Sequence, residues 1–560
     1  MAQLTTQQSF NVALQRHQSG RLREAEALYR QILTQQPAHV GALHYLGVLE
    51  HQQGRNELAI DMIGRAIALN PNAPEAHNNL GLALKANGQV DEAIAAYRQA
   101  LALKSNYASA LYNLGFALQS KEQLDEAIAA YQHAIALRPN YVEAHSSLGD
   151  ALREKGRLDE AIAAFRQAVA LGPDRPDAHN NLGVALKDKG QFEEAVAAYR
   201  RAIALRPDYA EAHSNLGNAL RSTRKLDEAI AAHRQAVALK PAFSEAHFNL
   251  ADALLARGDF LAAWPEHEWR WQCRDFPSPL RNFTQPRWDG SPLAGRTLLV
   301  HTEQGFGDSL QFIRYVPLLA NHGGKIIVEC QPELERLFHT VPGGFQVVVR
   351  DQPLPAFDVH CPVGSLPMVF KTTLATIPAD VPYLFPDQQL LESWRQKLAD
   401  SATGLKIGLA WAGNPAFKGD RTRSLTLDRL AALTNVPGVT FYSLQKGDAQ
   451  RQVERAPARI NLINLAPKLR DFADTAAVMC LMDLIITTDT SVAHLAGALG
   501  RPVWLMLQFV PDWRWLSDRA DNPWYPSMRL FRQQERGDWD SVIEEVAKAL
   551  ADQAGVLKRG

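Results

Sequence analysis

Polar residues follow two buried, β-branched segments in the C-terminal half of the chain, in patterns that could support group transfer. In the first, TLLVHTEQGFGDSLQF, a strand would end near His301 and an amphipathic helix would begin near Asp308. Gly305 and Gly307 allow a tight turn and a close approach of substrate to backbone. Asp308 is either the N-cap of the helix or a carboxylate that takes a proton from an acceptor hydroxyl, and spacing alone favours the cap.

The second pattern is LIITTDTSVAHLAGALG, which predicts a strand that ends in Thr488 and Asp489. A helix would then start at Thr490 and Ser491, with His494 one turn inside it. The free N–H groups and the positive dipole end of a helix form an anion site, and the two hydroxyls add donors. The pattern therefore suits a pyrophosphate, although Asp-Thr-Ser is also a good start for any helix.

Two more loops follow predicted strands in the same half. In KIGLAWAGNPAFKGDRTR, Gly413 leads into a loop with three basic residues, Lys418, Arg421 and Arg423. Such a loop can neutralise a diphosphate or simply form solvated surface, and the sequence favours neither interpretation. In VTFYSLQKG, Gln445 and Lys446 lie at a strand tip where a nucleotide could bind.

The segment from Asp489 to Pro502 reads Asp-Thr-x-x-x-His-x-Ala-x-Ala-Leu-Gly-x-Pro. It resembles the donor-site signature of the heptosyltransferase-like glycosyltransferases of GT-B fold, and the resemblance extends over roughly 295–535. It implies that Asp308 is the general base and that Lys418 contacts the leaving diphosphate. The implied donor contacts are Asp489, Thr490, Ser491 and His494. The family usually has glycine at the position of Ser491.

The resemblance also implies inversion at the anomeric carbon of the sugar. An acceptor oxygen deprotonated by Asp308 would attack, while the helix start at Thr490 and the ammonium of Lys418 stabilise the departing nucleoside diphosphate. Helix and lysine would take the electrostatic role of a metal, so the expected site has no metal and no cofactor. The expected donor substrate is a nucleotide sugar, with a UDP-sugar preferred.

The N-terminal half is built from repeats of 34 residues. Small residues recur at this interval, at Ala13, Gly47, Gly81, Gly115, Gly149, Gly183, Gly217 and Ala251. Glycines seven residues later can end a helix in the left-handed conformation, at Gly20, Gly54, Gly88, Gly156 and Gly190. The pattern resembles the tetratricopeptide repeat family, with about eight helical hairpins that would hold a protein or peptide.

Two polar registers run through the array. Histidine recurs at His77, His145, His179, His213 and His247, and is expected to pack between helices because leucine takes its place at Leu43 and Leu111. Asparagine recurs at Asn79, Asn113, Asn181, Asn215 and Asn249. This asparagine row resembles the concave ladder of O-GlcNAc transferase repeats, interrupted here by Tyr45 and Ser147. Its amides would pair with the backbone of an extended peptide, or else bond between helices.

These patterns predict an α-solenoid followed by an α/β GT-B fold of two Rossmann-like domains. The expected divisions are repeats over 6–275, a linker over 276–295 and an acceptor domain over 296–385. A second linker over 386–404 would lead to a nucleotide-sugar domain over 405–552 that ends in a helix. The tryptophan-rich end of the last hairpin, FLAAWPEHEWRWQC, predicts a fixed joint to the next domain.

Composition narrows the class of protein. The 560 residues include 59 basic and 60 acidic side chains, which removes any global argument for nucleic acid or an anionic membrane. Four scattered cysteines fit neither a disulfide framework nor a zinc site. Without a signal peptide or an apolar span, a cytoplasmic protein is expected.

Three functions remain open. The favoured one is glycosyl transfer to a polypeptide held by the repeats, because the domain order is similar to that of O-GlcNAc transferases. The second is transfer to a saccharide or a lipid-linked glycan, with the repeats docking a partner. The third is a non-catalytic scaffold, against which the retained set of Asp308, Lys418 and Asp489 to His494 argues.

Overall fold

The computed structural model describes residues 5–278, 280–303, 305–399, 404–417, 419–434, 436–455, 460, 462–517 and 519–557. It divides into two compact units, Met1–Ala219 and Leu220–Gly560. Lys418, the predicted diphosphate contact, lies outside the described residues. Among the described residues, no helix is both long enough and apolar enough to cross a membrane.

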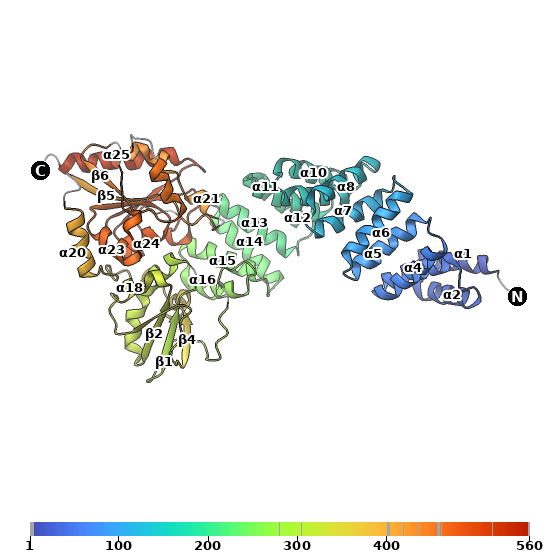
Figure 1. The fold of residues 1–560 in the computed structure, drawn as a ribbon, viewed down its shortest axis with the longest axis horizontal. Coiled ribbons are helices and arrows are strands. Elements are labelled where there is room, and N and C mark those ends of the chain that lie inside the picture. Colours follow the sequence, from blue (N-terminus) through green and yellow to red (C-terminus); the bar gives the residue numbers. More distant parts are fainter. Residues whose placement is uncertain are drawn as a thin grey trace. The chain divides into compact units, whose positions relative to one another are not determined.

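The first unit consists of paired helices, shown from blue to teal in Figure 1. They are α1 (Thr6–Gln18), α2 (Leu22–Gln35), α3 (Val40–Gln52), α4 (Asn56–Leu69), α5 (Pro74–Ala86), α6 (Val90–Leu103), α7 (Ala108–Ser120), α8 (Leu124–Leu137), α9 (Val142–Glu154), α10 (Leu158–Leu171), α11 (Pro176–Asp188), α12 (Phe192–Leu205) and the larger part of α13 (Ala210–Ser222). The predicted helical solenoid is confirmed.

The small residues of the repeat allow close helix packing. A Cβ atom on Gly81 would lie 2.5 Å from Cε1 of Tyr97, and one on Gly183 would lie 2.6 Å from Cε1 of Tyr199. The predicted left-handed turns are also confirmed, with φ between 75° and 86° at Gly20, Gly54, Gly88, Gly156 and Gly190. The 34-residue pattern thus encodes both the contact within each hairpin and the turn that closes it.

The second unit begins with the end of the array and continues into two parallel sheets. The array ends in α14 (Leu226–Leu239), α15 (Ser244–Arg257), α16 (Phe260–His267) and the 3₁₀ helix η1 (Glu268–Gln272). The first sheet region contains β1 (Thr297–His301), α17 (Phe306–Phe312), η2 (Ile313–His322), β2 (Lys325–Cys330), η3 (Pro332–Leu334), α18 (Glu335–Phe338), β3 (Gln346–Val349), β4 (Val359–Pro362), η4 (Val363–Ser365) and α19 (Leu366–Val369).

The second sheet region follows. It contains α20 (Gln388–Lys397), β5 (Leu405–Ala410), α21 (Asp420–Arg423), η5 (Leu427–Leu430), α22 (Ala431–Thr434), β6 (Val439–Ser443), η6 (Asp448–Arg455), β7 (Leu462–Asn464), η7 (Ala466–Lys468), α23 (Phe472–Cys480), β8 (Leu484–Thr488), α24 (Ser491–Ala498), β9 (Val503–Leu507), η8 (Trp513–Trp515), β10 (Met528–Arg532) and α25 (Trp539–Leu557).

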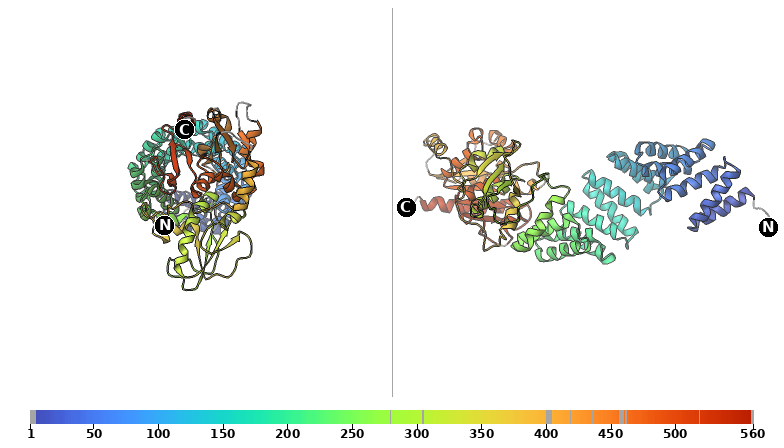
Figure 2. Two further views of the ribbon diagram at one scale, coloured as in Figure 1. Left: turned by 90° about the vertical axis from the view of Figure 1, so that its left-hand side faces the viewer. Right: turned by 90° about the horizontal axis from the view of Figure 1, so that it is seen from below.

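Both sheets are parallel, which confirms the predicted α/β class. The first has the strand order β3-β2-β1-β4 and the second β10-β9-β8-β5-β6-β7. They form separate layers, yellow-green and orange to red in the left view of Figure 2. Residues of α23 and α24 pack on one face of the six-stranded sheet, and residues of α25 pack on the other. Parallel strands bring their carboxyl ends to one edge, where ligand sites of such sheets lie.

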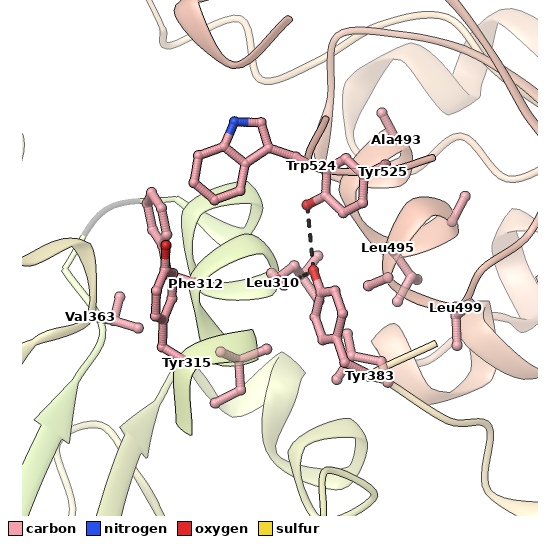
Figure 3. Packing of buried hydrophobic residues seen from close by; sticks show 14 of the residues in the cluster. Leu310, Phe312, Tyr315, Val363, Tyr383, Ala493, Leu495, Leu499, Trp524 and Tyr525 are labelled. Atoms are coloured by element: carbon pink, nitrogen blue, oxygen red, sulfur yellow. Dashed lines mark hydrogen bonds between the residues drawn. The ribbon is translucent and has the colours of Figure 1, made fainter. Parts of the chain in front are cut away.

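One hydrophobic core joins the two sheet regions (Figure 3). The Tyr383 hydroxyl donates to the backbone oxygen of Leu310 at 2.9 Å and lies 3.5 Å from the Tyr525 hydroxyl. The guanidinium of Arg314, which is buried, donates to the backbone oxygen of Trp524 at 2.8 Å and to Tyr383 at 2.9 Å. The shared core and this arginine hold the two regions together.

The end of the repeat array belongs to the same core. Phe260 and Trp264 are buried, and the Trp264 indole lies 5.9 Å from that of Trp513. The indole N–H of Trp264 donates to the backbone oxygen of Thr372 at 2.9 Å. Further along, Trp288 is buried and its backbone N–H donates to the backbone oxygen of His360 in β4 at 2.8 Å. The tryptophan-rich joint is therefore tightly packed.

Candidate active site

Two helix starts meet at the carboxyl ends of β1 and β8. α17 follows β1, α24 follows β8, and the two helices pack against each other. A Cβ atom on Gly307 would lie 2.9 Å from Cδ2 of His494 and 3.3 Å from its Nε2. Only a residue without a side chain leaves room for this contact, so Gly307 and His494 bring the two predicted motifs together.

Asp308 lies in the first turn of α17 but does not cap it. The N-cap is Gly305, so the interpretation of Asp308 as the N-cap is wrong. Its carboxylate instead forms an ion pair with Nη2 of Arg514, which lies in η8, 206 residues further along the chain. Burial raises the pKa of Asp308, and the charge of Arg514 opposes that rise.

Arg514 is the residue that the sequence did not reveal. Its Nη1 donates to Asp512 at 2.8 Å and its Nε donates to Oε1 of Gln311 at 2.5 Å. Its guanidinium also lies 4.4 Å from the ring centroid of Trp513. The sequence signal was the pair Asp512 and Arg514, a few residues after the buried strand β9, at a carboxyl end where ligand sites cluster.

His494 is buried and neutral. Its Nδ1 lies 2.9 Å from the hydroxyl of Tyr525, and its ring stacks on Trp515 with centroids 5.1 Å apart. Burial, and then the charge of Arg514, lower the pKa of His494 to about 3. It therefore packs and hydrogen-bonds in the site without carrying charge at neutral pH.

The start of α24 has the features of an anion site. Thr490 is its N-cap, and the threonine side chain makes no capping hydrogen bond. Ser491 is the first helical residue, and Asp489 precedes the cap in a buried position. Burial raises the pKa of Asp489, and the charge of Asp512 raises it further. Over the described part of the chain, no group of three or more His, Cys, Asp or Glu side chains could hold a metal ion.

The predicted cationic loop contributes Arg423. Its Nε lies 3.2 Å from Oδ1 of Asp420, and its charge acts on the pKa values of both Asp489 and His494. Gly413 lies against this pair, because a Cβ atom there would come within 2.8 Å of Nη2 of Arg423. The glycine therefore leaves room for the Asp420–Arg423 ion pair. Arg421 is exposed.

Gln445 and Lys446 bond to the backbone of neighbouring loops. Oε1 of Gln445 accepts from the N–H groups of Trp411 and Ala412, both at 2.9 Å. Its Nε2 donates to the oxygens of Ala412 and Lys446, both at 2.8 Å, so the hydrogen-bonding capacity of the amide is largely used. Nζ of Lys446 donates to the backbone oxygens of Ala466 and Leu469, at 2.9 and 2.8 Å.

The asparagine row makes bonds between neighbouring repeats. Nδ2 of Asn79 lies 2.9 Å from Nε2 of His44, Nδ2 of Asn113 donates to Asn78 at 3.0 Å, and Nδ2 of Asn215 donates to Asn180 at 3.1 Å. All five predicted asparagines, Asn181 and Asn249 included, are half-buried. The alternative of bonding between helices is thus realised at three positions, each of which uses one amide N–H.

The recurring histidines bond to the turn before their helix. Nε2 of His77, His145, His179, His213 and His247 lies 2.9 or 3.0 Å from the backbone oxygen of the proline six residues earlier. This bond holds each turn against the helix that follows it. The structural role expected for these histidines is confirmed.

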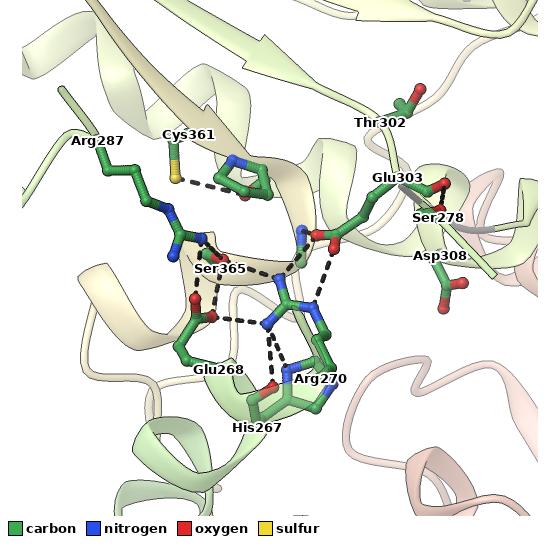
Figure 4. A network of polar contacts seen from close by, with 12 residues as sticks. His267, Glu268, Arg270, Ser278, Arg287, Thr302, Glu303, Asp308, Cys361 and Ser365 are labelled. Atoms are coloured by element: carbon green, nitrogen blue, oxygen red, sulfur yellow. Dashed lines mark hydrogen bonds and ion pairs between the residues drawn. The ribbon is translucent and has the colours of Figure 1, made fainter. Parts of the chain in front are cut away.

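A buried polar network connects the end of the array to the Asp308 loop (Figure 4). Arg270 of η1 is fully buried and forms a bidentate pair with Glu303, at 2.9 and 3.0 Å. It also donates to Glu268 at 2.8 Å and to Ser365 at 2.9 Å. Because Glu303 lies two residues before the N-cap of α17, the network fixes the loop that leads to Asp308.

These features define a helical-repeat protein whose last hairpin is built into an α/β region with a charged site between two helix starts. Family comparison agrees with both parts. The tetratricopeptide (TPR) repeat model matches six stretches, 47–88, 82–122, 117–152, 149–190, 185–223 and 217–258. The model of glycosyltransferase family 9 (heptosyltransferase) matches residues 429–504. The chain thus combines tetratricopeptide repeats with a C-terminal domain of glycosyltransferase family 9.

Individual proteins resemble parts of the chain. Protein FlbA of Caulobacter vibrioides is 29% identical over 322 residues, which are 53% of this chain and 54% of FlbA. The chain therefore spans about half the length of that curated relative. The crystal structure of MamA has 31% identity and a TM-score of 0.27, over 29% of this chain and 94% of MamA. That of YrrB, a TPR protein with an unusual peptide-binding site, has 23% identity and a TM-score of 0.30, over 33% and 95%.

Proposed function

We propose that this chain is a glycosyltransferase of GT-B type that moves a sugar from a nucleotide-diphosphate donor to a polypeptide. A UDP-sugar is the proposed donor, and the stereochemical outcome is inversion. The observation that carries the proposal is the contact of Gly307 with His494. It puts a half-buried carboxylate, Asp308, next to a helix start that suits a diphosphate.

The reaction follows from these groups. The diphosphate would accept hydrogen bonds from the first N–H groups of α24 and from the hydroxyls of Thr490 and Ser491. Lys418 and Arg423 would offset its charge. The proton of the acceptor hydroxyl passes to the Asp308 carboxylate as the acceptor oxygen bonds to the anomeric carbon. The bond from that carbon to the phosphate oxygen breaks, and its electron pair leaves with the nucleoside diphosphate.

The other predicted donor contacts take supporting roles in this proposal. Gln445 and Lys446 hold the loops that follow β5 and η7 through backbone bonds. His494 fills the space between Gly307 and Trp515 and presents a neutral ring to the donor sugar. Since the helix start and the basic side chains supply the electrostatic stabilisation, we propose a reaction that needs no metal ion.

The proposed acceptor is a polypeptide bound along the asparagine row. Asn113, which donates one N–H to a neighbouring repeat, has a second N–H for a peptide backbone. The side-chain oxygens of Asn79 and Asn181 accept from the preceding asparagine and have one further lone pair each. Asn249, the last residue of the row, lies on α15, and α15 packs against η8, which carries Arg514. A peptide at this end of the row would therefore lie next to the charged site.

Incubation of the full chain with nucleotide sugars tests the activity. Release of nucleoside diphosphate is expected for one member of a panel, to persist in a chelator such as EDTA, and to be lost in Asp308→Asn. Asp521→Asn is the control, because Asp521 forms an exposed ion pair with Arg519. Equal turnover by wild type and Asp308→Asn would contradict the base assignment.

The acceptor is tested separately by mass spectrometry of co-expressed host proteins. A sugar-sized mass increment on a polypeptide is expected, and its absence, with glycan labelled instead, would favour a saccharide acceptor. Replacing Asn181, Asn215 and Asn249 by alanine should weaken polypeptide transfer and spare donor hydrolysis. Loss of both activities would show that the asparagine row is structural.

A further inference from the structure

Arg514 stands between the two halves of the charged site. On one side its Nη2 pairs with Asp308 at the start of α17. On the other side the neighbouring residue of η8, Trp515, stacks on His494 of α24 with the ring centroids 5.1 Å apart. The arginine is nearly enclosed, with 11% of its side chain exposed, so its interactions with these groups are weakly screened by solvent.

The guanidinium has capacity for a further anion. Three of its five N–H bonds are directed to Gln311, Asp512 and Asp308, one from each nitrogen. Each terminal nitrogen therefore has a second N–H, and the planar fork suits two phosphate oxygens. Asp512 also accepts the backbone N–H of Arg514 at 3.0 Å, which fixes the base of the side chain.

We infer that Arg514 is a donor-binding residue that exchanges partners, pairing with Asp308 in the free protein and with the donor diphosphate when it binds. This inference rests on the proposed function and adds a residue outside the segment 429–504 that the family model matches. The exchange has a chemical consequence. Asp308 loses its cationic partner only when a donor is present, so the carboxylate becomes a stronger base at the moment an acceptor can be used.

The exchange predicts an unusual double-mutant cycle for binding. Titration calorimetry on the full chain would use UDP, GDP, ADP and CDP as probes, and the cycle would use whichever binds wild type. Arg514→Gln should weaken binding by about tenfold or more, because it removes a charged fork from the phosphates. Asp308→Asn should strengthen binding by roughly threefold to tenfold, because Arg514 no longer has to leave a carboxylate.

The decisive variant is Arg514→Gln combined with Asp308→Asn. If the aspartate acts through the arginine, Asp308→Asn has no effect in the Arg514→Gln background. An equal gain in both backgrounds would mean simple charge repulsion and would overturn the exchange, as would unchanged or weaker binding in Asp308→Asn. Asp521→Asn, in the exposed pair with Arg519, is the control and should leave affinity unchanged.

Thermal unfolding of each variant checks that it folds. If Arg514→Gln does not fold, Arg514→Lys replaces it, because lysine keeps the charge but cannot form the fork. The Asp308→Asn gain should then shrink in the Arg514→Lys background, and a gain of wild-type size would refute the inference. Binding of none of the four nucleotides by wild type would refute the proposed donor class itself. Normal nucleotide binding by wild type without the expected coupling in the double-mutant cycle would instead refute only the role of Arg514.

Discussion

Arg270→Met tests whether the buried network holds the Asp308 loop in place. The change removes the bidentate partner of Glu303, whose side chain is 3% exposed, and also a partner of Glu268. Loss of one member of a buried ion pair leaves an uncompensated charge, which costs about 3–5 kcal/mol. The expected fall in unfolding temperature is roughly 5–10 °C.

A second variant separates the charge effect from packing. In Arg270→Met/Glu303→Gln no carboxylate remains at position 303, and Glu268 keeps Arg287 at 2.9 Å, so most of the stability should return. Calorimetric unfolding measures both variants, with Arg395→Met as the control because its pair with Glu392 is exposed. Its expected effect is below about 0.5 kcal/mol.

The same variants report on function. Glu303 precedes the N-cap of α17, the helix that carries Asp308, whereas these variants do not change α24. Donor turnover should therefore fall about tenfold while nucleoside diphosphate affinity changes little. Wild-type stability in Arg270→Met, or a double variant no more stable than the single one, would refute the argument that the network is a charge-compensated joint.

Three further changes have expected outcomes. Gly307→Ala puts a methyl group 2.9 Å from Cδ2 of His494. Turnover should therefore drop by about tenfold or more, and stability should fall by about 1–3 kcal/mol. Gly305→Ala is the matched control, because no atom lies within 4 Å of the Cβ that it adds. Burial lowers the pKa of His233 from 6.5 to about 3 in the folded chain. As the pH falls below about 6.5, the unfolded chain protonates this histidine while the folded chain does not, so stability is lost. His233→Phe should remove about 2 kcal/mol of that loss at pH 5, measured by denaturant unfolding, and an unchanged pH profile would contradict the assignment. Gln445→Glu loses two donated bonds to backbone oxygens and should weaken nucleoside diphosphate binding in calorimetry, whereas wild-type affinity would show that this turn does not shape the donor site.

Local features were predictable from the sequence. Each hairpin repeats the same contacts within 34 residues, so Gly81 and its equivalents reveal both the helix pairing and the turns. Strand–helix alternation likewise predicts parallel sheets, and parallel topology places the residues after β1 and β8 at sheet edges. The proximity of Asp308 to His494 follows from that rule together with the family resemblance.

Interactions between distant residues were not predictable. Arg514 pairs with Asp308 across 206 positions, and no periodicity links them. The sequence locates Gln445 at a strand tip but does not say that its amide turns back to the backbone of Trp411. Spacing alone favours Asp308 as an N-cap because aspartate is common there, yet Gly305 takes that position and the carboxylate pairs with Arg514.

The shared hydrophobic core has a consequence for how the protein can vary. Repeat arrays gain and lose units easily because each unit contacts only its neighbours. That freedom ends at the last hairpin, whose Phe260 and Trp264 complete the core of the sheet regions. Deleting it would expose Trp513 and Trp524 to water, and Ile230 of α14 belongs to the same core, so a change in the number of repeats can be tolerated only upstream of α14. The last repeat by sequence is, in its folding, part of the α/β region.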